Sequence, residues 1–206
     1  MNSNRVGARA IRNMHLLTFT TLAAFGQLIG QVESVHPSEQ PMALVRGLYA
    51  QVVSRHPIGV TKGSDMTTFA PFLSKALRRR IDQTAACEAD WFRQYPQAGM
   101  KPGFGWLELG LFSGDGEMAG PSAFHVEKTQ PKKDGTLRVK VTLTHAESNE
   151  HPWTWQVAVI VRREDRRYVV DDVIYLKDKN SPADVRLSKI LSEGCNGSHW
   201  VGYSNQ

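Results

Sequence analysis

Alternation of apolar and polar side chains marks the second half of the chain as a β-meander. Between Trp153 and Val161 every second residue is a large apolar one, which is the period of a strand with one buried face. A charged run over 163–167 then predicts a turn. Tyr168–Tyr175 returns as a second strand whose apolar residues fall on both faces, as in a central or doubly covered strand. We predict a hairpin over 153–175.

Two further strands are predicted before this hairpin. Residues 136–145 alternate in the same way, and residues 123–129 form a shorter β-rich run. Lys133-Asp134-Gly135 between them is typical of a tight hairpin turn. The pattern therefore predicts four antiparallel strands in sequence.

Helical spacing precedes the strands. Pro41 suits a first helical turn, and apolar residues follow it at intervals of three and four up to Val52. A longer stripe from Phe69 to Phe92 predicts a second helix, with Thr67 or Thr68 as its cap. Three consecutive arginines, 78–80, spread around this helix, so we interpret them as a solvated face.

A short closing helix is predicted over 183–192. Two helices followed by an antiparallel meander indicate an α+β fold, in which the N-terminal helices pack on one face of a curved antiparallel sheet. A curved sheet wrapped on a helix makes a cone, and we expect a ligand to be able to lie at its mouth.

The first 34 residues read as a targeting segment. Arg5, Arg9 and Arg12 precede a mostly apolar run over 16–29, which is typical of a signal peptide and short for a membrane span. We expect a periplasmic or secreted protein whose residues 35–206 form one domain, with no stable membrane span after processing. An uncleaved membrane anchor is the alternative.

The charge balance excludes one class of partner. The chain has 25 Lys and Arg against 20 Asp and Glu, a net charge of +5. Three arginines and Glu33 lie in the first 34 residues, so the domain itself carries +3. That is mildly basic, and no basic stretch is interleaved with aromatic residues, so we expect no nucleic-acid partner.

Histidines and cysteines show no zinc spacing, and no phosphate-binding loop is present, so we expect no metal and no cofactor. Only two cysteines occur, Cys87 and Cys195. In an exported chain an even pair suggests a disulfide. Two separate buried thiols are the alternative.

Asp171 and Asp172 are the candidate catalytic residues. Successive side chains of a strand point to opposite faces, so we predict that the two carboxylates are separated by the strand. Whichever one faces the interior of the cone is expected to have a raised pKa and to be a general-base candidate. In the alternative interpretation one is exposed, while the other pairs with an arginine or caps a backbone amide.

Aromatic residues and a glycine loop over 113–117 supply the binding candidates. These side chains form either part of the core or a recognition surface. The candidates for ligand or partner binding are Trp106, Phe112, Asp115, Glu117, Trp153, Trp155 and Tyr175.

Several segments resemble one protein family. They are Trp106–Glu117, Pro152–Val161, Tyr168–Asp178, Leu187–Cys195 and Trp200–Tyr203. Together they resemble an uncharacterised exported bacterial family with the nuclear transport factor 2-like, or cystatin-like, cone fold. The superfamily includes binding modules, assembly adaptors and enzymes such as ketosteroid isomerase, so the resemblance implies the fold more than the activity. Its enzymes need an inward carboxylate and an oxyanion donor, and no residue here matches the donor.

Three functions follow as hypotheses. The first is an exported, non-enzymatic binding or accessory domain of unknown ligand, whose partner is an envelope protein or a small apolar ligand. The second is a small-molecule isomerase or lyase with an aspartate base. The third is an immunity or inhibitor-like protein that binds a partner through the rim loop 113–117. A homodimer is left open.

Overall fold

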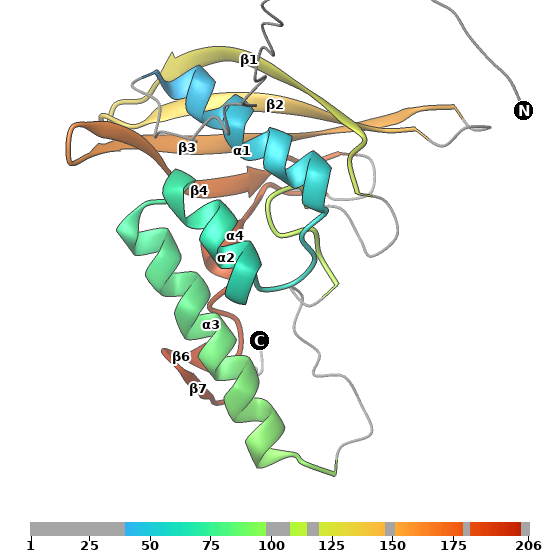
Figure 1. The fold of residues 1–206 in the computed structure, drawn as a ribbon, viewed down its shortest axis with the longest axis vertical. Coiled ribbons are helices and arrows are strands. Elements are labelled where there is room, and N and C mark those ends of the chain that lie inside the picture. Colours follow the sequence, from blue (N-terminus) through green and yellow to red (C-terminus); the bar gives the residue numbers. More distant parts are fainter. Residues whose placement is uncertain (1–39, 98–107, 115–119, 147–150, 179–181, 203–206) are drawn as a thin grey trace, which may run out of the picture. The chain divides into compact units, whose positions relative to one another are not determined.

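The computed structural model describes residues 40–97, 108–114, 120–146, 151–178 and 182–202. All of them belong to one compact unit, Ser34–Gln206. The unit combines helices with an open antiparallel sheet of five strands (Figure 1), which confirms the predicted α+β class.

The strands follow one another in the sheet in the order in which they occur along the chain. They are β1 (Ala123–Pro131), β2 (Leu137–His145), β3 (Trp153–Glu164), β4 (Arg167–Tyr175) and β5 (Val185–Arg186). All neighbouring pairs are antiparallel, and the four long strands are those that the sequence predicts. The β3–β4 turn is narrower than expected: Asp165 and Arg166 both have positive φ, at 47° and 69°, as the tight turns that match strand twist require.

The register gives the sheet two distinct ends. Leu137 pairs with both Pro131 and Val161, so the β1–β2 and β3–β4 turns lie at one end, which we name the turn end. The opposite end, which we name the loop end, holds the start of β1, the pair of His145 and Trp153, and Tyr175.

The helices are α1 (Pro41–Arg55), α2 (Gly63–Phe69), the 3₁₀ turn η1 (Ala70–Phe72), α3 (Lys75–Gln94) and the short α4 (Leu187–Ile190). Helix α1 begins at Pro41 as predicted. Its C-cap, His56, places Nε2 3.1 Å from the carbonyl oxygen of Pro121, just before β1. Helix α1 therefore runs toward the loop end and begins nearer the turn end (Figure 1).

The prediction of one helix through Phe69–Phe92 is wrong. Pro71 has no N–H to donate, and the chain passes through η1 into an extended Leu73 before α3 starts. Thr67 and Thr68 lie inside α2, where their hydroxyls donate to the carbonyls of Gly63 and Ser64.

Ser74 is the cap that the sequence analysis missed. Its buried hydroxyl accepts a hydrogen bond from the Leu77 N–H at 3.0 Å, and its own N–H donates to Val170 O at 2.8 Å. The same serine thus starts α3 and fastens the helix to β4.

The main core lies between the helices and one face of the sheet. Helix α1 contributes the apolar stripe that its sequence predicts, and β3 contributes Val157, Val159 and Val161. The intervening Ala158 and Ile160 form a second, smaller cluster with Ile174 on the other face. The period of two predicted for β3 is therefore confirmed.

Strand β4 breaks that period. Ile160 pairs with Asp172 while Val161 pairs with Val170, so Asp171 is an extra residue in a β-bulge. Val170 and Val173, three positions apart, both lie in the main core. Alternation of successive side chains, on which the predicted separation of Asp171 and Asp172 depends, is interrupted at this point.

The closing helix is shorter than predicted. Val185–Arg186 pairs with β4 as β5, so helix covers only Leu187–Ile190 of the expected 183–192. After it, β6 (Cys195–Asn196) and β7 (His199–Trp200) form a separate two-stranded hairpin. In the part of the chain that the structure describes, no helix is long and apolar enough to cross a membrane.

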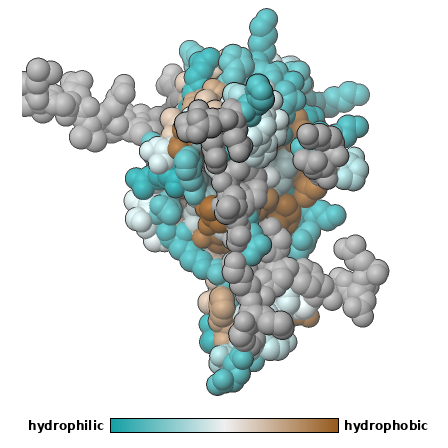
Figure 2. Space-filling model, turned by 90° about the vertical axis from the view of Figure 1, so that its right-hand side faces the viewer, coloured by the Kyte–Doolittle hydropathy of each residue, from teal (hydrophilic) through white to brown (hydrophobic). Residues whose placement is uncertain are grey.

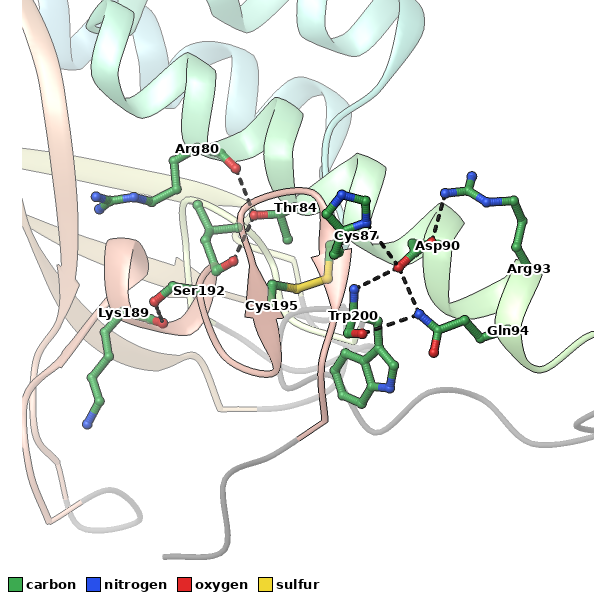
Figure 3. Close-up of a disulfide and its surroundings, with 12 residues drawn as sticks. Arg80, Thr84, Cys87, Asp90, Arg93, Gln94, Lys189, Ser192, Cys195 and Trp200 are labelled. Carbon is green, nitrogen blue, oxygen red and sulfur yellow. Dashed lines mark hydrogen bonds and ion pairs between the residues drawn. A yellow bond between two sulfur atoms is a disulfide. The ribbon is translucent and has the colours of Figure 1, made fainter.

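Cys87 and Cys195 form the predicted disulfide (Figure 3). Their Cα atoms are 6.1 Å apart, and the bridge spans 108 residues of sequence. It joins the middle of α3 to the β6–β7 hairpin. In the chain-entropy model, closing a loop of this length contributes roughly 4–5 kcal/mol to stability.

The Ser74 cap leads to the first prediction. Ser74→Ala removes the acceptor for the buried Leu77 N–H, so we expect a loss of about 1–2 kcal/mol in the free energy of unfolding, measured by urea denaturation. Thr67→Ala is the matched control, because Thr67 is exposed and its hydroxyl bonds only within α2. We expect a change within about 0.5 kcal/mol for that variant. Equal losses in both variants would show that Ser74 has no special role as a cap.

Candidate functional site

Asp172 is buried at 3% exposure and has four hydrogen-bond donors. Its Oδ1 accepts from the N–H groups of Val173 at 2.9 Å and Ser188 at 3.0 Å. Its Oδ2 accepts from Arg186 Nε at 2.8 Å and from Ser188 Oγ at 2.7 Å. The carboxylate therefore fastens β4 to β5 and to the first turn of α4.

Asp171 occupies the bulge and meets a different cation. Its Oδ2 lies 3.6 Å from Arg162 Nη1, and its side chain is 24% exposed. Its Oδ1 is buried and has no hydrogen-bond partner among the residues that the structure describes.

Both carboxylates meet arginines on the sheet face that lies away from the main core. Arg162 follows the core residue Val161 in β3, and Arg186 pairs with Ile174 of the second cluster. The sequence predicts that the two carboxylates lie on opposite faces of the strand. Because of the bulge, both lie on the same face. The contacts of Asp172 are those of the alternative interpretation, a pair with an arginine plus backbone amides. Sequence reasoning did not find Arg186 and Ser188, because the register of β5 against β4 is not visible in a pattern of apolar residues.

A segment at the loop end is held by three aromatic side chains. Tyr175 Oη donates to Leu111 O at 2.7 Å, Tyr49 Oη donates to Phe112 O at 2.8 Å, and Trp155 Nε1 donates to Ser113 O at 2.7 Å. Three consecutive carbonyls are therefore fixed, and we name residues 111–113 with these three donors the carbonyl clamp.

The clamp is buried and tightly packed. Leu111 and Phe112 are fully buried, and the Phe112 ring lies 5.0 Å from that of Phe69. Burial also raises the pKa of Tyr49, so its hydroxyl stays protonated and remains a donor. Gly114 has a φ of 74°, and a Cβ there would lie 2.5 Å from the ring of Tyr175. Only glycine suits this position.

The clamp brings together three of the predicted binding residues, Phe112, Trp155 and Tyr175. Their polar atoms or rings are engaged in holding the segment. Tyr49 was missed, although a hydroxyl within the apolar stripe of a helix signals a buried partner. Trp106, Asp115 and Glu117 lie outside the described residues.

Trp153 differs from the other candidates because it is exposed, at 44%. Its ring stacks on that of Trp155, with 4.6 Å between centroids and 25° between planes. The ring of His145 lies 5.8 Å away. We name these three residues the tryptophan platform. Figure 2 looks onto the side of the molecule to the right in Figure 1, where the loop end lies, and apolar surface shows there between hydrophilic residues.

A fourth cluster surrounds the disulfide (Figure 3). Asp90 Oδ2 accepts hydrogen bonds from Trp200 N and Gln94 Nε2, each at 2.9 Å, and Oδ1 accepts from Arg93 Nη2 at 2.9 Å. The Trp200 N–H, with smaller contributions from Gln94 and Arg93, holds the pKa of the Asp90 carboxyl below its ordinary value. Asp90 and the disulfide together fasten the β6–β7 hairpin to α3.

Metal binding finds no support here: within the ranges that the structure describes, no group of three or more His, Cys, Asp or Glu is placed to hold an ion.

Comparison with known proteins does not assign the chain to a family. No protein-family model matches the chain, and no curated protein or solved structure matches it. The resemblance to the cone superfamily therefore stays a prediction.

The Asp172 network leads to the second prediction. Asp172→Asn removes the charge that faces Arg186 and replaces one acceptor oxygen by an NH2 group that faces N–H donors, so we expect a loss of about 2–4 kcal/mol in the free energy of unfolding. Asp171→Asn is the control, with an expected loss below about 1 kcal/mol, because its ion pair with Arg162 is long and partly exposed. Chemical denaturation measures both. A larger loss at Asp171 would reverse this assignment.

Asp90 gives a prediction about pH. A carboxyl whose pKa is lowered by folding stabilises the folded state above its ordinary pKa, and this contribution is lost as the pH falls through the folded-state pKa. We expect wild type to be more stable than Asp90→Asn at neutral pH, with the gap closing below about pH 4. Thermal unfolding from pH 7 to pH 3 measures the gap.

Asp82→Asn, which removes an exposed carboxylate from the same helix, is the control, and its stability at neutral pH should stay within about 0.5 kcal/mol of wild type. A gap between wild type and Asp90→Asn that stays constant with pH would contradict a role for the ionised carboxylate.

Proposed function

We propose that this chain is an exported, non-enzymatic binding domain that contacts an envelope protein through the tryptophan platform at the loop end. One observation carries the proposal: Trp153 is nearly half exposed, yet it is stacked on a neighbour. Tryptophan is enriched among the residues that dominate binding energy. The disulfide supports export, because such bridges persist in oxidising compartments.

The platform is organised before any partner arrives. The Trp155 indole is fixed by its bond to Ser113 O, and Trp153 stacks on it. A side chain already held in one orientation loses little conformational entropy on binding, so more of its contact energy appears as affinity.

Neighbouring residues favour a partner protein over a small apolar ligand. The buried apolar rings at this end, Phe112 among them, are packed within the core. Ser113, whose carbonyl the Trp155 indole binds, begins the loop 113–117 that the immunity-like hypothesis singles out. Gly114 follows Ser113 and is partly exposed, so the two binding hypotheses concern neighbouring residues at the loop end.

An isomerase or lyase is less well supported. That chemistry needs a carboxylate that faces its substrate and can accept a proton. The Asp172 oxygens receive four donors, and Asp171 faces Arg162. We therefore assign both aspartates structural roles.

The cone fold belongs to the same proposal. Its support is the cover of one sheet face by α1, with core residues from α2 and α3, together with the carbonyl clamp at the loop end. This arrangement is compatible with a nuclear transport factor 2-like domain, and it motivates that assignment.

Site-specific crosslinking tests the platform. A photoreactive phenylalanine derivative replaces Trp153 in one variant and Phe92 in another, since Phe92 is a comparably exposed aromatic residue, at 50%, on α3. We expect a discrete adduct in the native envelope from position 153 and none from position 92. Trp153→Ala should weaken binding to the protein recovered in that adduct about tenfold or more, with Phe92→Ala unchanged. Equal adducts from both positions would contradict the proposal.

A further inference from the structure

A hollow of about 390 Å³ lies between α3 and the segment that precedes it. Met66 of α2 and Ala70 of η1 give it an apolar lining. The charged lining comes from one face of α3, where four side chains follow one another at helical spacing: Lys75, Arg78, Arg79 and Asp82. We name this space the arginine hollow. Its volume falls within the range of small-molecule sites, about 300–1,000 Å³.

The three consecutive arginines of α3 have different surroundings. Arg79 and Arg80 are exposed, as a solvated face requires, but Arg78 is half-buried. Arg80 does not line the arginine hollow and instead lines a second hollow beside Cys195. Successive residues of a helix are turned by about 100°, so Arg80 can lie outside a space that the two residues before it line. Arg79 and Arg80 are therefore a matched pair for a test.

The Arg78 guanidinium lacks a partner. Its Nε is buried and has no hydrogen-bond partner among the residues that the structure describes. A buried N–H without an acceptor is unfavourable, so such groups are nearly always paired with a protein atom, a water molecule or an ion. Because the same side chain lines the arginine hollow, an oxyanion bound there would lie beside a guanidinium that the fold leaves unpaired.

Positive charges are close together on this face of α3. The Lys75 ammonium is paired with Asp165 Oδ2 at 2.6 Å, and this pairing raises the pKa of Lys75. The positive charge of Arg78 lies near enough to act in the opposite direction on the same pKa. Arg78 and Arg79 form no ion pair with any residue that the structure describes. These two guanidinium groups are therefore the cations available to a ligand.

We propose that the arginine hollow binds a small phosphate monoester. Such a group carries a charge of about −1.5 to −2 at neutral pH and has three terminal oxygens. These oxygens can accept hydrogen bonds from both guanidinium groups at once, whereas one arginine fork already occupies both oxygens of a carboxylate. The organic part of the ester would contact Met66 and Ala70.

The site is separate from the tryptophan platform. Lys75, at the start of α3, meets Asp165 in the β3–β4 turn, so the arginine hollow lies toward the turn end of the sheet. The platform lies at the loop end. This inference therefore does not rest on the proposed function.

Titration of the full chain with phenyl phosphate tests the site, followed by nitrogen–proton NMR of the arginine side chains at constant ionic strength. We expect saturable binding with a Kd below about 10 mM and a shift of the Arg78 Nε signal. Phenyl sulfate has the same shape but a single negative charge. We expect it to bind about threefold or more weakly, because its Coulomb attraction to the two guanidinium groups is smaller.

Two variants with the same change in charge locate the site. Arg79→Gln should raise the Kd for phenyl phosphate about fivefold or more, because it removes a charged donor from the lining. Arg80→Gln is the control and should change the Kd less than about twofold, because this exposed charge is outside the hollow and is screened. Asp82→Asn should tighten binding about twofold, because it removes a negative charge from the lining. Thermal unfolding checks that each variant is folded.

Three results would overturn the inference. The first is an Arg78 signal that does not move at about 10 mM phenyl phosphate. The second is a loss of affinity in Arg80→Gln that equals or exceeds the loss in Arg79→Gln. The third is binding of a phosphoserine peptide about tenfold or more tightly than phenyl phosphate, which would assign the hollow to a phosphorylated protein.

Discussion

The burial of one apolar face of the sheet is the constraint on which the rest of this structure depends. Strands β2, β3 and β4 place valine side chains on that face. If these valines stayed in contact with water, the folded state would lose about 25 cal/mol of stability for each Å² of apolar surface left unburied. Helix α1 lies along this face, and α2 and α3 add core residues such as Phe69, Leu77 and Ile81. Two further features lie where helices meet the sheet: Ser74 joins the start of α3 to β4, and Tyr49 of α1 binds the carbonyl clamp at the loop end.

The bulge at Asp171 shows how one inserted residue reassigns chemistry. Without it, strand periodicity would send one of the two aspartates toward the main core. With it, both carboxylates meet arginines on the opposite face, and Asp172 becomes the point at which β5 and α4 are attached. Bulges often re-aim side chains at active sites. Here Asp172, beside the bulge, has hydrogen-bond donors at both oxygens.

The two ends of the sheet differ in chemistry because different segments converge on them. Short hairpin turns meet at one end, where they carry lysines and arginines beside the start of α3. At the other end, aromatic donors hold a connecting segment and leave Trp153 exposed. The disulfide and Asp90 stabilise the C-terminal hairpin against α3, at a location separate from both ends.

The sequence by itself determined the α+β class, the four long strands, the start of α1 and the cysteine pair, because each depends on local periodicity, turn chemistry or the count of one residue type. Only tertiary structure decided the bulge at Asp171 and the conversion of Val185–Arg186 from predicted helix to strand, since a neighbouring strand selects each outcome. The break at Pro71 has a local cause, the missing N–H of proline, which the helical spacing of the apolar residues concealed. Trp155 and Trp153 illustrate the division within one strand. Their spacing places both indoles on one face, but the carbonyl of Ser113, from a segment far away in the sequence, determines which indole is fixed and which is left exposed.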